Sequence, residues 1–208
     1  MFSIEKALKI QENLAKFISK KSEFKKLDVV AGVDAAYIND LGVGAAVLMD
    51  YLTLKPIEKA FSIFKVKVPY IPGFLSFREL PVIFKALKSL SLNPDIIIVN
   101  GHGLAHPRKF GLACHLGFIL NKPTIGVAKN RLYGIEKENF LVNKEELIGY
   151  ILKFKGRKKI YVSVGNKISL EDAIEIIKHC SPEGFPEPLK LAHKEALRKK
   201  QELILNKC

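Results

Sequence analysis

The sequence predicts an α/β protein whose mixed sheet is flanked by helices, and two observations predict it. Three successive stretches with strand character, residues 29–37, 42–50 and 57–68, are joined by short links, which favours antiparallel pairing. Two short, mostly apolar strand candidates, residues 95–99 and 124–127, then alternate with helical patterns, as strands buried on both faces of a parallel sheet do. We therefore expect three antiparallel strands followed by parallel strands.

The N-terminal half begins with a helix and continues with the three strands. Within residues 2–18 the apolar side chains mostly follow helical spacing, and a polar connector comes after them. The first strand is built from β-branched and small residues, and Asp34 interrupts it. A turn at residues 39–42 leads into the second strand. In the third strand, apolar and polar side chains alternate well enough for it to pair with the second.

Helices and buried strands alternate in the second half. Residues 76–90 have helical periodicity, and Asn93 and Pro94 end that helix before the strand at 95–99. The remaining expected elements are a helix at 112–120, the strand at 124–127, ordered segments at 145–154 and 159–163, a helix at 169–179 capped at Ser169, and a basic helix at 188–206.

Length and composition indicate one domain over residues 1–208. The chain has 208 residues, of which 48% are apolar, enough to form a single core. Its apolar runs are far shorter than the ~20 residues of a membrane span, and its charged start lacks the apolar block of a signal peptide. Three scattered cysteines without CxxC spacing are typical of a reducing compartment. We expect a soluble cytoplasmic monomer with no membrane partner.

The charge balance indicates the class of partner. There are 34 Lys and Arg residues against 21 Asp and Glu residues, a net charge of +13. Such a field attracts polyanions, so nucleic acid is the first partner to consider. The alternative is a lysine-rich surface that serves heat adaptation, but glutamate usually rises with lysine in such proteins, and here it does not keep pace.

Two carboxylates are candidates for chemistry. Asp34 stands in a strand that is otherwise apolar, where an unpaired carboxylate is costly, so it should meet a cation or hydrogen-bond donors. Bonding to loop amides is the alternative, but we favour a Mg²⁺ ligand. Glu79 also fits an S-x-x-E capping box that starts at Ser76, and that structural role is an open alternative.

Two loops are also unusual. Residues 69–73, Pro-Tyr-Ile-Pro-Gly, form a stiff loop with apolar tips that can enter between stacked bases, although a turn packed on the core is the alternative. Residues 100–108, Asn-Gly-His-Gly-Leu-Ala-His-Pro-Arg, follow a buried strand at the sheet edge where ligands usually bind. Glycines allow close backbone approach there, and His and Arg suit phosphates or base edges.

Five stretches, in order over nearly the whole chain, resemble the endonuclease V family of inosine-directed nucleases. They are Val33-Asp34-Ala35-Ala36-Tyr37; Pro69-Tyr70-Ile71-Pro72-Gly73 with Phe77-Arg78-Glu79; Gly101-His102-Gly103 with Ala105-His106-Pro107-Arg108; Gly126-Val127-Ala128-Lys129; and Pro186-Glu187-Pro188 with Leu191-Ala192-His193. That family's fold is similar to ribonuclease H, so the resemblance implies a ribonuclease H-like mixed sheet.

The resemblance implies a Mg²⁺-dependent endonuclease, with Mn²⁺ as a substitute, that cuts DNA at the second phosphodiester bond 3′ to a deaminated base such as hypoxanthine. Inosine in RNA is left open as a second substrate. The implied metal ligands are Asp34, Glu79 and Asn100; the implied phosphate contacts are Lys129 and His193; the implied wedge is Pro69, Tyr70, Ile71 and Pro72; and the implied lesion pocket is Gly73, Leu75, Gly101, Gly103, His106, Leu112 and Leu132. For His193, a packed core position is the alternative.

Two positions depart from the family pattern. Asn100 stands where the family has a metal-binding aspartate, and residues 163–167 lack the usual Ser-Pro-Gly-His-Arg. An asparagine carbonyl can coordinate Mg²⁺, but it brings no charge. The alternative function is therefore a natural or engineered protein that binds inosine-containing nucleic acid without cutting it.

Overall fold

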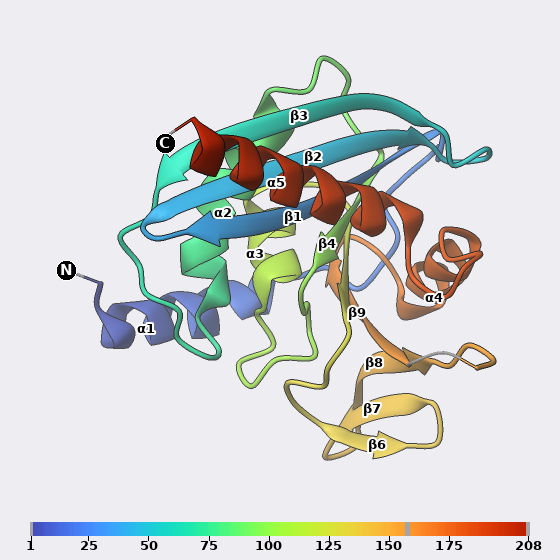
Figure 1. Cartoon of the computed structure of the whole chain (residues 1–208). Helices are drawn as coiled ribbons and strands as arrows, with labels where there is room; N and C mark the ends of the chain where they lie inside the picture. Colours follow the sequence, from blue (N-terminus) through green and yellow to red (C-terminus); the bar gives the residue numbers. More distant parts are fainter. Residues whose placement is uncertain (1, 157–158, 207–208) are drawn as a thin grey trace.

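The computed structural model describes residues 2–156 and 159–206, which form a nine-stranded sheet with helices on both faces (Figure 1). The helices are α1 (Ile4–Leu14), the short 3-10 helix η1 (Ala15–Phe17), α2 (Leu75–Lys88), α3 (Leu112–Leu120), α4 (Leu170–His179) and α5 (Glu187–Leu205). The strands are β1 (Val29–Ile38), β2 (Leu41–Asp50), β3 (Pro56–Lys65), β4 (Ile96–Asn100), β5 (Thr124–Ala128), β6 (Ile135–Lys137), β7 (Phe140–Asn143), β8 (Glu146–Leu152) and β9 (Ile160–Asn166).

The strand order is β3-β2-β1-β4-β5-β9-β8-β7-β6. Strands β1, β2 and β3 pair antiparallel, whereas β4 pairs parallel with both β1 and β5. The predicted α/β class, with antiparallel strands followed by parallel ones, is therefore confirmed. The sheet then continues through β9, β8, β7 and β6, all antiparallel, and the sequence did not indicate β6 and β7 as strands.

The two faces of the sheet carry different helices. Helix α5 lies across β1 and β2 on one face, and α2 and α3 lie behind the sheet (Figure 1). Gly32 permits the close approach of α5, because a Cβ there would lie 2.2 Å from the backbone of Pro188. Side chains alternate along β1, so Val30 joins the core under α4 and α5 while Ala31 and Val33 join the core under α2 and α3. Asp34 therefore faces α5.

The two expected helix starts have different outcomes. Ser169 caps α4 as predicted, since its Oγ accepts a hydrogen bond from the Asp172 backbone N–H at 3.0 Å. The capping box at Ser76 is wrong, because α2 begins at Leu75 and Ser76 is buried inside its first turn. The Ser76 hydroxyl lies 3.1 Å from Nδ1 of His115 on α3, so a tertiary contact has taken the place of the cap.

No helix within residues 2–156 and 159–206 is long and apolar enough to cross a membrane. Cys114 and Cys180 are buried and unpaired, and Cys208 lies outside the described residues.

Candidate active site

Asp34 and Asn100 are neighbours on two parallel strands. The β1–β4 register pairs Val33 with Val99, so the next residue on each strand lies side by side at the carboxyl end of β4. Nδ2 of Asn100 donates to Oδ1 of Asp34 at 3.0 Å, and the Ala35 backbone N–H donates to the same oxygen at 2.9 Å. Asp34 is only 5% exposed, so these donors supply the partners that a buried carboxylate requires.

His193 on α5 completes the contacts of Asp34. Its Nδ1 lies 2.7 Å from Oδ2 of Asp34, and its side chain is 50% exposed. A carboxylate only accepts hydrogen bonds, so the proton sits on Nδ1, and Nε2 of a neutral ring is free to accept a proton. The half-exposed ring is not a packed core histidine.

Glu79 on α2 lies within electrostatic range of Asp34. Burial, and next the negative charge of Asp34, raise the pKa of Glu79 to about 8. Among residues 2–156 and 159–206, no side chain forms a hydrogen bond or ion pair with its carboxylate. A cation beside the two carboxylates would offset the repulsion between their negative charges.

The donor set fits a hard divalent cation. Asp34 and Glu79 supply carboxylate oxygens and Asn100 supplies an amide oxygen, which are the ligand types that Mg²⁺ and Mn²⁺ prefer. The described residues contain no group of three His, Cys, Asp or Glu side chains placed to hold a metal. With Asn100 in place of a third carboxylate, this donor set has one negative charge fewer than three carboxylates would give.

Lys129 lies at the edge of a groove beside these residues. It follows β5, it is exposed, and its Nζ lies 4.9 Å from the ring centroid of Phe185. The groove has a volume of about 430 Å³ and is lined by Tyr70, Pro72, Gly73, Leu75, Asn100, Gly101, His102, Ala128, Lys129, Asn130, Arg131 and Leu132. It thus connects the loop at residues 69–72, Asn100 and Lys129. Sequence reasoning missed Arg131, whose charge next to Lys129 was the available signal.

The loop at residues 69–72 projects from the surface. Tyr70 is 67% exposed, so the tip is not packed on the core. The loop ends in a turn in which the Phe74 backbone N–H donates to the carbonyl of Ile71 at 2.9 Å. Pro72 and Gly73 occupy the centre of this turn, and Gly73 has a φ of +79°, as a type II turn requires. The turn and the two prolines make the loop stiff.

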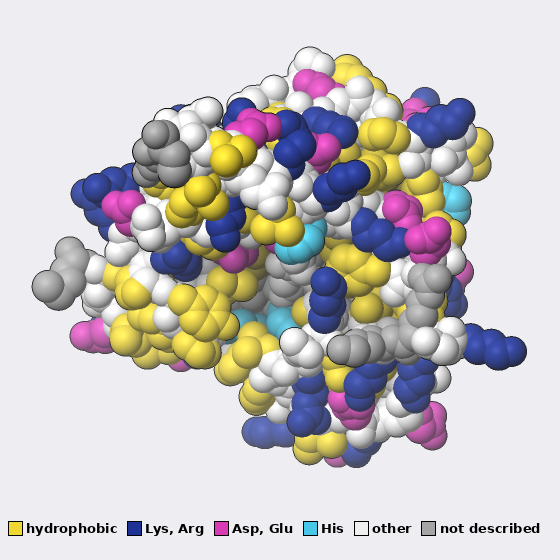
Figure 2. Space-filling view, in the orientation of Figure 1, with side chains coloured by type: hydrophobic (Ala, Val, Ile, Leu, Met, Phe, Trp, Pro, Cys, Tyr) yellow, Lys and Arg dark blue, Asp and Glu magenta, His cyan; other side chains and the backbone are white. Residues whose placement is uncertain are grey.

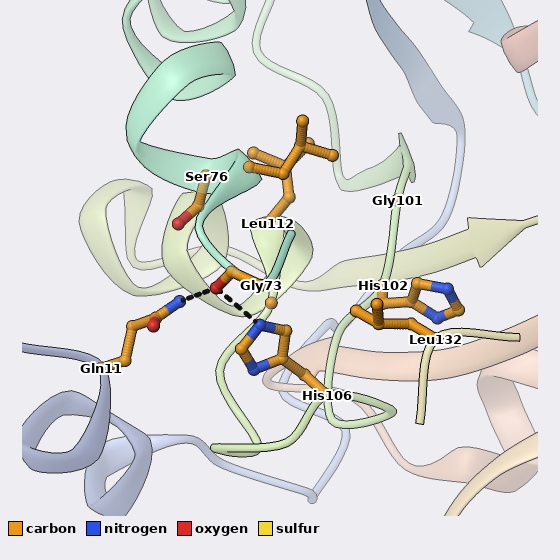
Figure 3. Close-up of a pocket in the computed structure, with 10 residues that line it drawn as sticks. Gln11, Gly73, Ser76, Gly101, His102, His106, Leu112 and Leu132 are labelled. Carbon is orange, nitrogen blue, oxygen red and sulfur yellow. Dashed lines mark hydrogen bonds between the residues drawn. The ribbon is translucent and has the colours of Figure 1, made fainter. Parts of the chain in front are cut away.

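A small cavity, whose lining residues Figure 3 shows, shares five of them with the groove. It is lined by Gln11, Gly73, Leu75, Ser76, Gly101, His102, His106, Gly111, Leu112 and Leu132. Six of the seven residues expected in a lesion pocket are in this set, and Gly103 is not. Gly103 serves the fold instead, since its N–H donates to Oγ of Ser163 at 2.9 Å and a Cβ there would lie 2.0 Å from the carbonyl of Val164.

His106 is held in one neutral tautomer at the wall of the cavity. Its Nδ1 accepts from the Arg108 backbone N–H at 3.2 Å, so the ring proton sits on Nε2, which lies 3.0 Å from the carbonyl oxygen of Gly73. Burial lowers the pKa of His106 to about 4. The cavity wall therefore carries no charge at this position at neutral pH.

Basic side chains surround this region of the surface. Figure 2 shows Lys and Arg side chains on both sides of a hollow in which histidine side chains are visible, between α5 and the β6–β8 end of the sheet. On α5, the nearby glutamates pair with Lys190, Arg198 and Lys199, so part of the basic charge of this helix is neutralised locally.

Comparison with known proteins finds relatives of this chain over most of its length. A family model described as Endonuclease V matches residues 12–194. The endonuclease V of Dictyoglomus thermophilum is 41% identical over 199 residues, which cover 91% of this chain and 87% of the relative. The crystal structure of the endonuclease V from Streptomyces avermitilis is 33% identical, with a TM-score of 0.92 over 98% of this chain and 96% of the other.

A second solved structure was determined with nucleic acid. The endonuclease V of Ciona intestinalis, in complex with a 24mer DNA containing an inosine followed by a ribo-adenosine, is 28% identical to this chain. Its TM-score is 0.88, and the match covers 96% of this chain and 98% of the other.

Proposed function

This chain belongs to the endonuclease V family of nucleases, and from that premise we propose that it recognises deoxyinosine in DNA and hydrolyses the second phosphodiester bond 3′ to the lesion with Mg²⁺. The observation that carries the proposal is the group formed by Asp34, Asn100 and His193, which meets at the end of parallel strands beside Glu79 and an open groove. The DNA-bound relative supports the substrate class.

Each residue of this group has a distinct role in the proposal. Asp34, Glu79 and Asn100 would hold Mg²⁺, which when bound lowers the pKa of a water molecule and offsets charge on the scissile phosphate. His193 orients the Asp34 carboxylate through Nδ1 and presents Nε2 for positioning or proton transfer. Lys129, at the groove, offsets phosphate charge with its ammonium group.

The lesion is captured by two further parts of the surface. The exposed loop at residues 69–72 fills the gap in the duplex, and the small cavity receives the base that leaves it. Most of the cavity lining is apolar or backbone, which suits the face of a purine. The stiffness of the Pro72–Gly73 turn limits the entropy that the loop loses on insertion.

A second function is favoured by Asn100 alone. One charge at contact distance is worth ~4 kcal/mol at an effective dielectric constant near 20, so the asparagine should weaken metal binding and slow cleavage. The chain would then bind inosine-containing nucleic acid without cutting it.

A nicking assay separates these two functions. A duplex with a single deoxyinosine is incubated with Mg²⁺ or Mn²⁺ and either the chain as it stands or the Asn100→Asp variant. Equal nicking by both proteins would exclude the binding-only function. Tight binding without nicking, rescued by Asn100→Asp, would exclude cleavage by the natural chain. Asn93→Asp, at an exposed loop position, controls for an added charge.

A further inference from the structure

The carbonyl oxygen of Gly73 accepts hydrogen bonds from three side chains. Nη2 of Arg108 lies at 2.7 Å, Nε2 of His106 at 3.0 Å and Nε2 of Gln11 at 3.1 Å. Figure 3 shows Gln11 and His106 reaching this oxygen from different elements. Gln11 belongs to α1, whereas His106 and Arg108 belong to the loop after β4.

Gln11 links all the members of this cluster. It is 1% exposed, and Nε2 also donates to the carbonyl of Phe110 at 3.1 Å. Its Oε1 accepts from Nε of Arg108 at 2.7 Å. A buried amide whose donors and acceptor are all used is costly to replace, because each partner left behind is unsatisfied. Gln11 also lines the small cavity, and no other role described above uses this glutamine.

These hydrogen bonds hold Gly73, the residue of the turn that ends the exposed loop at residues 69–72. Gly73 lines both the small cavity and the groove, and it stands at the positive-φ position of the turn that ends the loop. The Arg108 guanidinium also stacks on the ring of Phe74, 4.5 Å from its centroid. Rotation of the peptide after Gly73 would break three hydrogen bonds together. The direction of the loop is thus fixed relative to the cavity.

We propose that Gln11 is a positioning residue for lesion capture, which holds the loop at residues 69–72 in register with the cavity through the Gly73 carbonyl and Arg108. This inference rests on the proposed function. It has a specific consequence, because a fixed loop matters only where a base must leave a paired stack. An inosine in single-stranded DNA leaves no gap for the loop to fill, so its binding should not depend on Gln11.

The test measures the affinity of the full chain for deoxyinosine in a duplex and in the same strand unpaired, by fluorescence anisotropy. Gln11→Glu keeps the size of the side chain and the acceptor for Arg108 but removes both amide donors; Gln11→Met keeps the size and removes all polarity. Gln201→Glu, at the other glutamine of the chain, is exposed on α5 and is the matched control. Thermal unfolding of each variant reports whether it folds.

We expect both Gln11 variants to weaken duplex binding at least tenfold while single-strand binding stays within threefold of the original chain. Fluorescence of 2-aminopurine placed next to the lesion should rise less on binding than it does with the original chain. Equal weakening on both substrates, or no weakening on either, would overturn the role of Gln11. If the original chain itself does not prefer deoxyinosine over deoxyadenosine duplex, the proposed function fails, and the inference fails with it.

Discussion

The side-chain nitrogen of Asn100 lies 3.0 Å from Oδ1 of Asp34, so an amide donates a hydrogen bond at a place where an aspartate would set two carboxylates against each other. The asparagine therefore stabilises the site without a cation. A carboxylate at the same position would instead depend on one, because like charges in a buried site repel.

The first prediction concerns stability. Asn100→Asp should lower the free energy of unfolding by about 1–3 kcal/mol in the presence of a chelator, because it removes the hydrogen bond and adds a like charge. Adding Mg²⁺ should raise the melting temperature of the variant more than that of the original chain. Thermal unfolding with and without Mg²⁺ measures both effects, and an identical response of the two proteins would contradict the assigned ligand set.

The second prediction concerns His193. His193→Ala should reduce the nicking rate roughly 10²–10⁴-fold with little change in binding, because the ring orients Asp34 and offers the only free imidazole nitrogen described at this carboxylate. Single-turnover nicking in the Asn100→Asp background gives the rate. His179→Ala, at an exposed histidine that bonds to the carbonyl of Tyr51, is the control. A rate that matches this control would remove His193 from the mechanism.

The third prediction concerns charge at the groove. Lys129→Ala should weaken duplex binding and reduce the slope of log affinity against log salt by about one. Lys199→Ala should change both quantities less, since Lys199 is paired with Glu202 on α5. Titration at several salt concentrations measures the slopes. A slope near zero for the original chain would support heat adaptation as the reason for its charge.

The fourth prediction separates two glycines of one loop. A Cβ at Gly103 would lie 2.0 Å from the backbone oxygen of Val164, so Gly103→Ala should destabilise the fold by about 3 kcal/mol or more. A Cβ at Gly101 meets the flexible side chain of Leu112 at 3.2 Å. Gly101→Ala should therefore fold and lose affinity for deoxyinosine. Denaturant unfolding and anisotropy test the pair, and the opposite pattern would contradict the cavity as the lesion pocket.

The fifth prediction is a pH dependence of stability. Burial lowers the pKa of His115 from 6.5 to about 4, so the unfolded chain takes up a proton that the folded chain does not. The resulting contribution to the free energy of unfolding is present above pH 6.5. It is lost as the pH falls towards 4, by up to about 3 kcal/mol. Denaturant unfolding from pH 7 to pH 4 should show a smaller loss of stability for His115→Gln than for the original chain. An unchanged loss would show that His115 is not buried in its neutral form.

The fold was predictable where burial dictates the pattern. β-branched runs gave the central strands, and the short links gave the antiparallel order of β1 to β3. Strands β6 and β7 were missed because they are only three and four residues long, too short for a periodic pattern to be recognised. Ser76 was misread as a cap because a local motif does not show which distant side chain competes for the hydroxyl.

Part of the candidate site was predictable from the same burial pattern. Asp34 interrupts an apolar strand and Asn100 ends one, and a polar residue at either place needs a partner. Gln11 was not recognised as part of the site, although a glutamine on the buried stripe of an amphipathic helix was the available signal. Its partners come from residues 62 to 99 positions away, and only the fold brings them together.

The position of the cut is the most direct measurement of the proposed reaction. A duplex with one deoxyinosine, labelled at the 5′ end of the lesion strand, is incubated with the Asn100→Asp protein and Mg²⁺, and the product length is read at single-nucleotide resolution. The proposed reaction gives one labelled product that ends one nucleotide 3′ of the inosine, and no product from the matched deoxyadenosine duplex. Cuts at other positions, or equal cutting of both duplexes, would contradict it.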